Sequence, residues 1–365
     1  MKILFFGLEK MKFMPYINFY LDNIDKSKND VHVITWNRNL KDEDLSAYSD
    51  ITFHEVKHYL SLTKTKLQKY WGYYKLRKLA LKIIRKNKFD MIVSLHTMPG
   101  VIISGKIHRK FKNKFIFDYR DLTKENKSKL YKKIVRRNVV DSLCTFVSSD
   151  GFRKVLPESE TYKIFTSHNI LVDSLNHSKD KEMFNVPSKK IRISFWGILR
   201  NNELNFSLAE KIGADDRFEL HYYGREEKTI LLLKDFVKEK SIKNVFFHGE
   251  YVPTDRYKFI TETDIIHNVY YDENMVMAMS NKYYDGVIFR LPQLCCKDTF
   301  MGKMVAKEKV GLVIDPLEEN LTQKIFDYYT SLNQNEFNNN CQIAQERFLK
   351  EYYDGAEKVK EIFNK

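Results

Sequence analysis

Short runs of apolar residues recur along the whole chain, separated by segments whose apolar positions follow helical spacing. In the first half the apolar runs predict strands near residues 2–6, 31–36, 51–56, 90–95, 114–118, 143–148 and 162–165. In the second half they predict strands near 191–196, 218–223, 244–248, 264–269, 291–295 and 310–314. Near-continuous apolar strands that alternate with helices are typical of parallel sheets covered on both faces, so we predict an α/β protein.

The segments between these runs predict the helices. In the first half they lie at 64–87, 99–111 and 124–140. In the second half they lie near 203–211, 226–240, 254–261, 280–287 and 318–332, and a final helical segment covers 335–363 with no strand after it. Helices that alternate with parallel strands require right-handed crossovers, which bring the carboxyl ends of the strands to one edge, where ligands bind.

The series of predicted strands starts at two places in the chain. KILFFG opens the first series and ends in Gly7, and IRISFWG opens the second and ends in Gly197. Because 365 residues exceed one comfortable core, we predict two Rossmann-like domains that face each other across a ligand cleft. The predicted parts are an N-terminal domain at 1–175, a linker at 176–190, a C-terminal domain at 191–340, and a C-terminal helix at 341–365 that could pack back on the first domain.

Composition favours a folded cytoplasmic protein. A content of 43% hydrophobic and 14% aromatic residues argues against disorder. The N-terminus is a poor signal peptide because charged residues interrupt its short apolar run, and no run approaches the ~20 apolar residues that cross a bilayer. Four cysteines lack the spacing of zinc ligands, which favours free thiols in a reducing cytosol.

Positive charge gathers in one region. The net charge is +14, and residues 64–137 contain 23 Lys and Arg against four acidic residues, so the rest of the chain is net negative. An anionic partner for this region is one reading: a membrane surface, a nucleic acid or an acidic acceptor. The alternative is that the protein is rich in lysine as a general feature of its composition. This would explain the total charge better than it explains the concentration of positive charge in residues 64–137.

The basic segment 64–88 predicts an amphipathic helix with ten Lys and Arg and no acid. Leu67, Trp71, Tyr74 and Leu81 follow at helical spacing, as expected of a helix that lies on anionic lipid with its aromatic side chains at headgroup depth. The same helix must bury one face against the sheet, so core packing explains part of this pattern. We expect a peripheral location at the inner face of the plasma membrane. Nucleic acid is not an expected partner, because no known nucleic-acid motif is present.

Two segments of the second half contain candidate chemistry. In WGILRNNELNFSLAE (196–210) a strand ends at Gly197, and Arg200 lies in the turn before a helix, where it could clamp a diphosphate. In SNKYYDGVIFRLPQLC (280–295) a helix start carries Asn281 and Lys282, and Asp285 could accept the hydroxyls of a ribose. Each has a plain alternative: a solvated loop arginine, a surface lysine and a helix-end aspartate. No GxGxxG is present, so a dinucleotide site is not supported.

The first half offers candidates for acid–base chemistry. Asp121 and Glu9 are carboxylates that could act as a base toward an acceptor hydroxyl. Asp121 could instead pair with Arg120, and Glu9 could simply be exposed. His96 ends a buried strand in VSLHT, where it is either a cleft residue or a structural histidine.

The ordered series of motifs resembles GT-B glycosyltransferases, particularly glycosyltransferase family 4. In the second half the matching segments are WGILR, LHYYG (220–224), FFHGEY (246–251), TDIIHNVY (263–270), NKYYDG, LPQLC and GLVIDP (311–316). In the first half the looser matches are FDMIVSLHT, FIFDYRDL, DSLCTFVSS and FTSHNI. The likeness covers nearly the whole chain, and its strength lies in the order of the pieces.

The resemblance implies that a sugar is transferred from a nucleotide-sugar donor, UDP- or GDP-linked, to a glycan acceptor. It implies a polyprenyl-linked acceptor, bacterial surface or capsular polysaccharide as the product, retention of configuration, and no metal or other cofactor. Arg200 would neutralise the donor diphosphate and Asp285 would hold the ribose. The donor site would also include Gly197, Gly224, Asn281 and Lys282.

Several positions depart from the family pattern. The family commonly has two glutamates eight positions apart, but here Asp285 occupies the second place and Met277 the first. GLEK replaces the usual Gly-Gly of the first turn, and Arg120 or Asp121 stands where a histidine often follows the fifth strand. Two other functions therefore stay open: a nucleotide-sugar 2-epimerase of the same fold, and a non-enzymatic nucleic-acid-binding protein.

Overall fold

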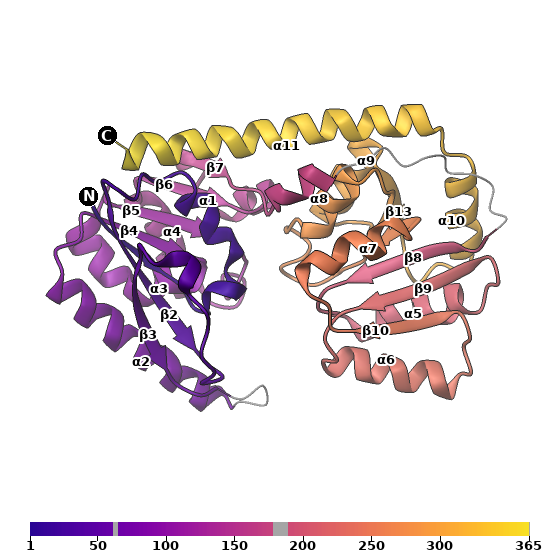
Figure 1. Ribbon diagram of the computed structural model, residues 1–365, viewed down its shortest axis with the longest axis horizontal. Helices are drawn as coiled ribbons and strands as arrows, with labels where there is room; N and C mark the ends of the chain where they lie inside the picture. The colour runs from indigo at the N-terminus through magenta and orange to yellow at the C-terminus, as the bar shows by residue number, and fades with distance from the viewer. Residues whose placement is uncertain (61–64, 178–188, 365) are drawn as a thin grey trace. The chain divides into compact units, whose positions relative to one another are not determined.

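The computed structural model describes residues 1–60, 65–177 and 189–364, which form two compact units (Figure 1). Unit 1 consists of Met1–His168 with Lys350–Lys365, and unit 2 consists of Asn169–Leu349. Most of the predicted linker 176–190 lies outside the described residues, as does the first residue of the basic segment 64–88.

Unit 1 is built on a seven-stranded sheet in the order β3-β2-β1-β4-β5-β6-β7. Every neighbouring pair in it is parallel. Six of its strands are fully or largely buried because apolar side chains point to both faces, whereas the edge strand β3 buries only Val56. The seven strands are β1 (Lys2–Phe6), β2 (Asp30–Asn37), β3 (Thr52–Lys57), β4 (Met91–Leu95), β5 (Phe115–Tyr119), β6 (Cys144–Val147) and β7 (Ile164–Thr166).

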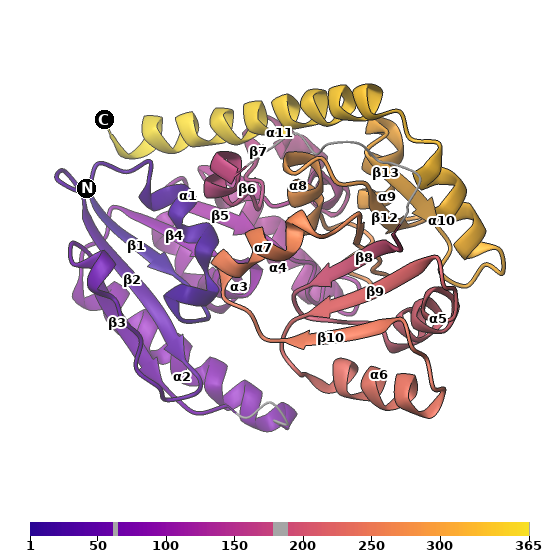
Figure 2. The ribbon, with the colours of Figure 1, turned by 45° about the vertical axis from the view of Figure 1, so that its right-hand side comes forward.

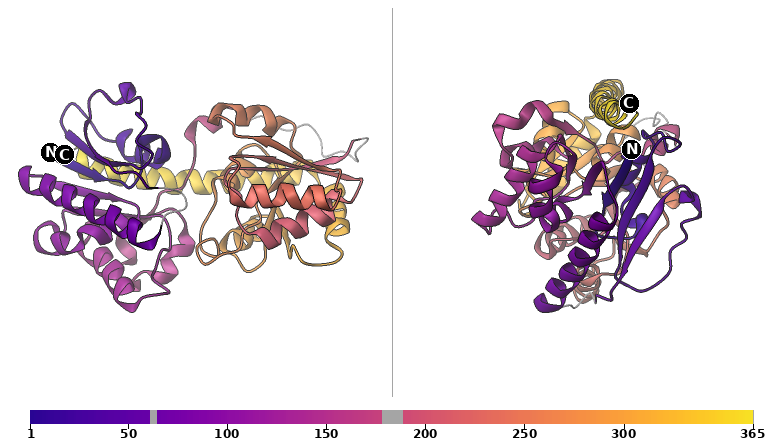
Figure 3. Two further views of the ribbon diagram at one scale, coloured as in Figure 1. Left: turned by 90° about the horizontal axis from the view of Figure 1, so that it is seen from below. Right: turned by 90° about the vertical axis from the view of Figure 1, so that its left-hand side faces the viewer.

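Helices cover both faces of this sheet. On one face lie α2 (Lys66–Lys86), α3 (Thr97–Lys106) and α4 (Lys129–Asp141), which pack on one another in that order (Figure 3). The first of them, α2, begins at a capping box in which the Thr65 hydroxyl accepts from the backbone N–H of Gln68 at 3.2 Å. On the other face α1 (Asn18–Leu21) packs Phe19 and Tyr20 edge-on against Phe146.

Unit 2 is built on a six-stranded parallel sheet in the order β10-β9-β8-β11-β12-β13 (Figure 2). Its strands are β8 (Ile191–Trp196), β9 (Phe218–Tyr223), β10 (Val245–Gly249), β11 (Ile265–His267), β12 (Gln293–Cys296) and β13 (Gly311–Ile314). Its helices are α5 (Asn202–Gly213), α6 (Lys228–Glu239), α7 (Arg256–Thr261), α8 (Asn281–Ile288), α9 (Phe300–Glu308) and α10 (Leu321–Thr330).

The last helix, α11 (Gln334–Phe363), contributes to both units. Its residues up to Leu349 belong to unit 2, and those from Lys350 onward belong to unit 1. In unit 1 the ring of Tyr352 lies 5.2 Å from that of Phe19, and Asn29 donates to the carbonyl of Phe363 at 3.0 Å. The end of the chain is therefore part of the core of the first unit.

The predicted α/β class, with two Rossmann-like parallel sheets, is confirmed. Each strand lies within a few residues of its predicted position. Two helices, α1 and α9, were not predicted, and the other differences lie at helix ends. The helix predicted from residue 124 begins only at Lys129, where Ser128 caps it by accepting from the N–H of Tyr131 at 3.2 Å. The one predicted from 254 begins at Arg256, after a 3₁₀ turn at Pro253–Asp255.

The strand order in each sheet reverses at one point. In unit 1 this point lies between β1 and β4, and in unit 2 it lies between β8 and β11. At such a point the loops after two neighbouring strands diverge and leave a crevice at the carboxyl edge of the sheet, where open α/β proteins bind ligands. The turns after β1, β4, β8 and β11 are therefore the places to look for a site.

Candidate active site

The turn after β8 brings two backbone segments unusually close together. Gly197 follows the strand with a φ of +119°, a conformation that favours glycine. A Cβ atom at Gly224, directly after β9, would lie only 2.1 Å from the carbonyl oxygen of Gly197. Glycine is therefore required at 224, where any side chain would push the two strand ends apart.

Helix α8 presents an uncapped N-terminus at the same edge. Its N-cap residue Ser280 makes no capping hydrogen bond, because its hydroxyl donates to Oδ1 of Asn268 at 2.6 Å. Asn281, the first residue of the helix, is exposed. Free backbone N–H groups and the positive end of the helix dipole favour an anion at this position.

Lys282 joins α8 to the end of β8. Its Nζ donates to the carbonyl of Trp196 at 3.1 Å and to the hydroxyl of Tyr270, and lies 4.4 Å from the centre of the Phe195 ring. The residue is only 6% exposed. Burial lowers the pKa of Lys282 to about 7, against the opposing effect of the Asp285 carboxylate. This amine can therefore gain or lose its charge near neutral pH.

Asp285 lies on the same helix, in the interior of unit 2. Its Oδ2 accepts from the indole N–H of Trp196 at 3.0 Å, and its Oδ1 lies 3.6 Å from the guanidinium of Arg256. The residue is 3% exposed. Burial raises the pKa of Asp285, and the charge of Arg256 opposes that shift most strongly.

Arg200 differs from these two residues because it is exposed. Its guanidinium forms no ion pair with a carboxylate in the part of the chain that the structure describes. Its charge lowers the pKa of Lys282 and opposes the burial that raises the pKa of Tyr270. Arg200 therefore acts on the same end of β8 as Lys282. We call Gly197, Arg200, Lys282 and Asp285 the β8 cluster.

In unit 1 the structure brings His96 and Asp121 together. His96 follows β4 and Asp121 follows β5, and His96 Nε2 lies 2.6 Å from Asp121 Oδ2. The imidazole is 22% exposed and the carboxylate 44% exposed. The hydroxyl of Thr97 donates to the carbonyl of Asp121 at 2.8 Å, which ties the two strand ends to each other.

The backbone at His96 is strained. Its φ of 85° and ψ of 158° fall in a region that is essentially limited to glycine. The hydroxyl of Ser94 donates to the His96 carbonyl at 3.0 Å and helps to hold this conformation. Strain of this kind persists where the surrounding structure enforces it, commonly at functional sites.

The remaining first-half candidates have structural partners. Arg120 is buried, its Nε donates to Asp118 Oδ2 at 2.8 Å, and its guanidinium lies 4.3 Å from the centre of the Tyr16 ring. Glu9, which follows β1, forms an ion pair with Arg38, with Oε1 2.5 Å from the guanidinium. Arg120 is thus part of the interior, whereas Glu9 lies at the carboxyl edge with its charge compensated.

The candidate residues therefore fall into two groups. Gly197, Arg200, Gly224, Asn281, Lys282 and Asp285 lie at the carboxyl edge of the second sheet, and His96, Asp121 and Glu9 lie at that of the first. Sequence reasoning missed Trp196, Arg256 and Tyr270, which hold Asp285 and Lys282. Trp196 adjoins a predicted strand end and could have been suspected, but no local pattern distinguishes Arg256 from a surface arginine.

Three further observations concern the described residues alone. Nowhere in residues 1–60, 65–177 and 189–364 do three His, Cys, Asp or Glu side chains gather closely enough to hold a metal ion. All four cysteines in these ranges are buried and unbridged. The same ranges contain no helix that is both long and apolar enough to span a bilayer.

Comparison with known proteins agrees with this architecture. Residues 2–147 match the family model described as glycosyl transferase 4-like. Sucrose-phosphate synthase from Thermosynechococcus elongatus has a similar fold, with a TM-score of 0.74 and 10% identity over 100% of this chain and 99% of that one. A search of the curated proteins found no match.

Two other solved structures extend the likeness. HepE from Anabaena, solved in complex with UDP-glucose, gives a TM-score of 0.67 at 13% identity over 100% of this chain and 99% of that one. WaaG, a glycosyltransferase involved in lipopolysaccharide biosynthesis, gives 0.65 at 12% identity over 99% of both chains. Together these structures show that the chain has the GT-B fold of two Rossmann-like units. Within the first unit, residues 2–147 match the glycosyl transferase 4-like model, in line with the family resemblance of the sequence.

Proposed function

We propose that the protein transfers a sugar from a nucleotide-sugar donor, UDP- or GDP-linked, to a lipid-linked glycan acceptor during bacterial surface-polysaccharide synthesis. The observation that supports a donor site best is the position of Lys282 in the first turn of the uncapped helix α8, where the charge of the exposed Arg200 also acts on it. Two cationic side chains and free backbone amides at a switch point suit a diphosphate. HepE, a protein of the same fold, was solved with UDP-glucose.

The proposed reaction depends on stabilising the negative charge that develops on the leaving diphosphate. When the glycosidic bond to the diphosphate breaks, negative charge grows on the leaving oxygen, and prepositioned cations and amides stabilise it. Arg200 is exposed and can form a bidentate contact with phosphate oxygens. Lys282 has a pKa of about 7, so an incoming diphosphate would draw a proton onto its amine and strengthen the contact. Retention of configuration remains part of the proposal by analogy alone.

Asp285 can bind the ribose of the donor only if one of its present contacts changes. Both of its oxygens face protein groups, Trp196 on one side and Arg256 on the other. To hold the ribose, as the family resemblance implies, the carboxylate must exchange one of these contacts for a sugar hydroxyl. Its other role, as the counter-charge that raises the pKa of Lys282, requires no rearrangement.

For the acceptor we propose Asp121 as the base, oriented by His96. The carboxylate is exposed enough to meet a hydroxyl, and the 2.6 Å contact fixes its direction. Glu9 is the weaker candidate because Arg38 already compensates its charge.

A thermal-shift comparison of UDP-, GDP-, CMP- and dTDP-sugars tests the donor, because a ligand that binds only the folded state raises its melting temperature. Transfer of radiolabelled sugar from the selected donor to polyprenyl-diphosphate-linked glycans then tests the reaction. Release of an epimerised free sugar from donor alone would show a 2-epimerase instead. Strong binding of RNA without stabilisation by any donor would contradict both enzymatic functions.

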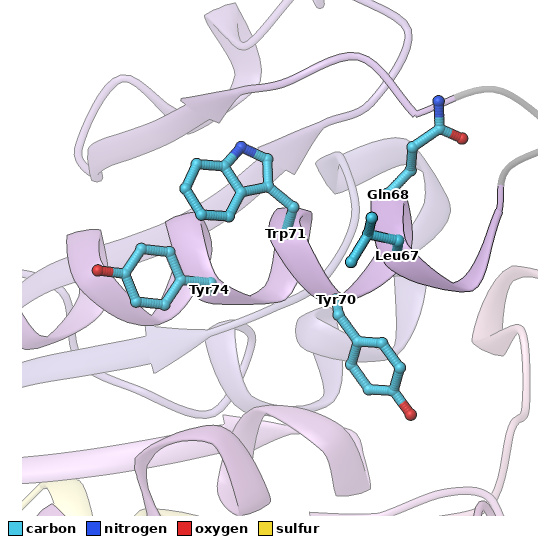
Figure 4. A pocket seen from close by; sticks show the side chains of 5 residues that line it. All are labelled: Leu67, Gln68, Tyr70, Trp71 and Tyr74. Atoms are coloured by element: carbon cyan, nitrogen blue, oxygen red, sulfur yellow. The ribbon is translucent and has the colours of Figure 1, made fainter.

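The exposed face of α2 supports a membrane-bound acceptor. Leu67, Tyr70, Trp71 and Tyr74 are between 52% and 79% exposed and line a shallow hollow (Figure 4). The rings of Trp71 and Tyr74 stack with centres 5.3 Å apart. Lysines and arginines surround them along the helix, a combination that suits anionic lipid headgroups. We therefore place the protein at the inner face of the membrane, bound through residues 64–88.

Co-sedimentation with vesicles tests this surface. Binding to phosphatidylglycerol vesicles, with little binding to phosphatidylcholine vesicles, is expected of the wild type. The double variant Trp71→Ala/Tyr74→Ala should bind the anionic vesicles more weakly. Tyr162→Ala, which removes an aromatic side chain that is 78% exposed elsewhere in unit 1, is the matched control. Equal binding by all three proteins would contradict docking through α2.

A further inference from the structure

The turn that carries Arg200 is held by one buried amide. Asn205, in the first turn of α5, is 1% exposed. Its Nδ2 donates to the carbonyl of Arg200 at 2.6 Å and to that of Asn201 at 2.8 Å. Its Oδ1 faces Nε2 of His267 at 3.0 Å. Both ends of the amide are thus used, and two of its three bonds hold the backbone at Arg200.

His267 determines which way this amide points. Its Nδ1 accepts from the backbone N–H of Val269 at 3.2 Å, so the proton of the neutral ring must lie on Nε2. A protonated Nε2 can only donate, which requires Asn205 to turn its oxygen toward the ring. The amide nitrogen then has to face the two carbonyls of the turn. Burial lowers the pKa of His267 to about 3, so the ring stays neutral across the working pH range, and the bond from Val269 keeps its proton on Nε2.

A third contact fixes the same turn from the other side. Asn201 adopts a left-handed conformation with a φ of 62°, which is costly outside glycine. Its Nδ2 donates to the carbonyl of Tyr271, in the segment that follows β11. The turn from Gly197 to Asn201 is therefore tied to β11 by two side-chain bridges, one through Asn205 and one through Asn201.

We propose that Asn205 and His267 are positioning residues for donor transfer, which hold the exposed Arg200 where it meets the diphosphate. The inference rests on the proposed function. Neither residue needs to touch the donor: Asn205 holds the backbone, and His267 holds Asn205. An arginine on a loosened turn would still reach the diphosphate, but it would spend less time in the productive geometry, and a displacement near 1 Å can cost about 100-fold in rate.

A double-mutant cycle with UDP as the probe tests this. Dissociation constants are measured by calorimetry for the wild type, Arg200→Ala, Asn205→Leu and the double variant. We expect Asn205→Leu to weaken UDP binding about tenfold when Arg200 is present and less than about twofold when it is absent, because residues that act as one unit are non-additive. Asn244→Leu, at the opposite end of β9 and β10, is the control and should bind like the wild type.

His267 provides the second readout. His267→Gln keeps an N–H that can donate to Asn205, whereas His267→Leu removes the donor and frees the amide to turn over. We expect the glutamine variant to retain most of the UDP affinity and the leucine variant to lose as much as Asn205→Leu. This order does not depend on Asn205→Leu being stable, so the inference can be tested even if that variant fails to fold.

The outcomes separate the two claims. Equal losses from Asn205→Leu with and without Arg200, or equal losses in both His267 variants, would overturn the positioning role and leave the proposed function standing. If the wild type binds neither UDP nor GDP, CDP or dTDP, the proposed function is wrong, and the inference is wrong with it.

Discussion

Both units have ionisable groups at the carboxyl edge of their sheet, but the groups differ in how deeply they are buried. In unit 2, Lys282 and Asp285 lie beside the end of β8, 6% and 3% exposed, and each has a shifted pKa. In unit 1, His96 and Asp121 follow β4 and β5 and are 22% and 44% exposed. The first pair is buried among protein partners, and the second is partly exposed to solvent.

The difference indicates a division of labour. Buried charges cannot reorganise cheaply, so the site at β8 is shaped before a ligand arrives, and only Arg200 reaches solvent there. A half-exposed carboxylate can meet a hydroxyl and exchange protons with water. The β8 cluster, in which Lys282 has a pKa of about 7, thus suits an anionic ligand, and the His96–Asp121 pair suits proton transfer to or from an acceptor hydroxyl.

The largest expected effect is on stability. Asp285→Ala leaves Arg256 and the indole N–H of Trp196 without their buried partner, and we expect a loss of about 3–5 kcal/mol in the free energy of unfolding. Asp121→Ala should cost less than about 1 kcal/mol, because the carboxylate that is removed is 44% exposed and its ion pair is screened by water. Urea unfolding of both variants measures the contrast. Similar losses in the two would mean that burial does not distinguish the two sites.

Arg200→Ala should leave stability unchanged and lower kcat by about 10²–10³, the range expected when one prepositioned donor to developing charge is lost. Steady-state transfer from the selected donor and a thermal melt measure the two effects. Arg217→Ala is the control, since Arg217 is paired with Asp215 just before β9 begins, away from the carboxyl edge. Unchanged turnover would remove Arg200 from the site.

Asp121→Asn should lower transfer to the acceptor about 100-fold, at the lower end of what a general base contributes. Donor binding should stay as in the wild type, because the proposed donor site lies in unit 2. Glu9→Gln is the comparison: if it causes the larger loss, the base is on β1 rather than on β5. Calorimetry with UDP and the transfer assay separate binding from chemistry.

The smallest expected effect is a pH dependence of donor binding. Lys282 of the free protein has a pKa of about 7, so at higher pH the amine is mostly neutral and must take up a proton when it meets a diphosphate. UDP affinity should therefore fall between pH 7 and 8.5, by at most about tenfold per pH unit. The profile of Lys282→Met should be flat. A wild-type affinity that does not change across this range would show that Lys282 takes up no proton when UDP binds.

The fold could be predicted from the sequence because its strands are apolar on both faces. Runs such as KILFF and IRISFW admit few alternatives, and the helices between them follow from spacing. Helix starts were less certain because capping decides them. Residues 124–128 carry helix-compatible side chains, yet the backbone turns into α4 only after Ser128 provides a cap.

Only part of the candidate site could be predicted from the sequence. Arg200 and Lys282 could be named because they follow a strand end and a helix start, which the sequence reveals. The burial of Asp285 could not be predicted from the sequence. It depends on Arg256 of α7 and on the indole of Trp196, which both contact its carboxylate. The same holds for His96, whose strained backbone is a product of its tertiary surroundings and leaves no trace in VSLHT.

The split membership of α11 has a consequence for synthesis. Residues 350–365 belong to unit 1, where Tyr352 and Phe363 contact its other residues and Glu351 is bonded to His168. The ribosome nevertheless adds these residues after all of unit 2. The first unit emerges early but must wait, with part of its sheet uncovered, until the final turns of the chain leave the exit tunnel. A stop codon before residue 350 should therefore harm the first-made unit more than the second, and a nascent chain paused there should recruit chaperones to its oldest half.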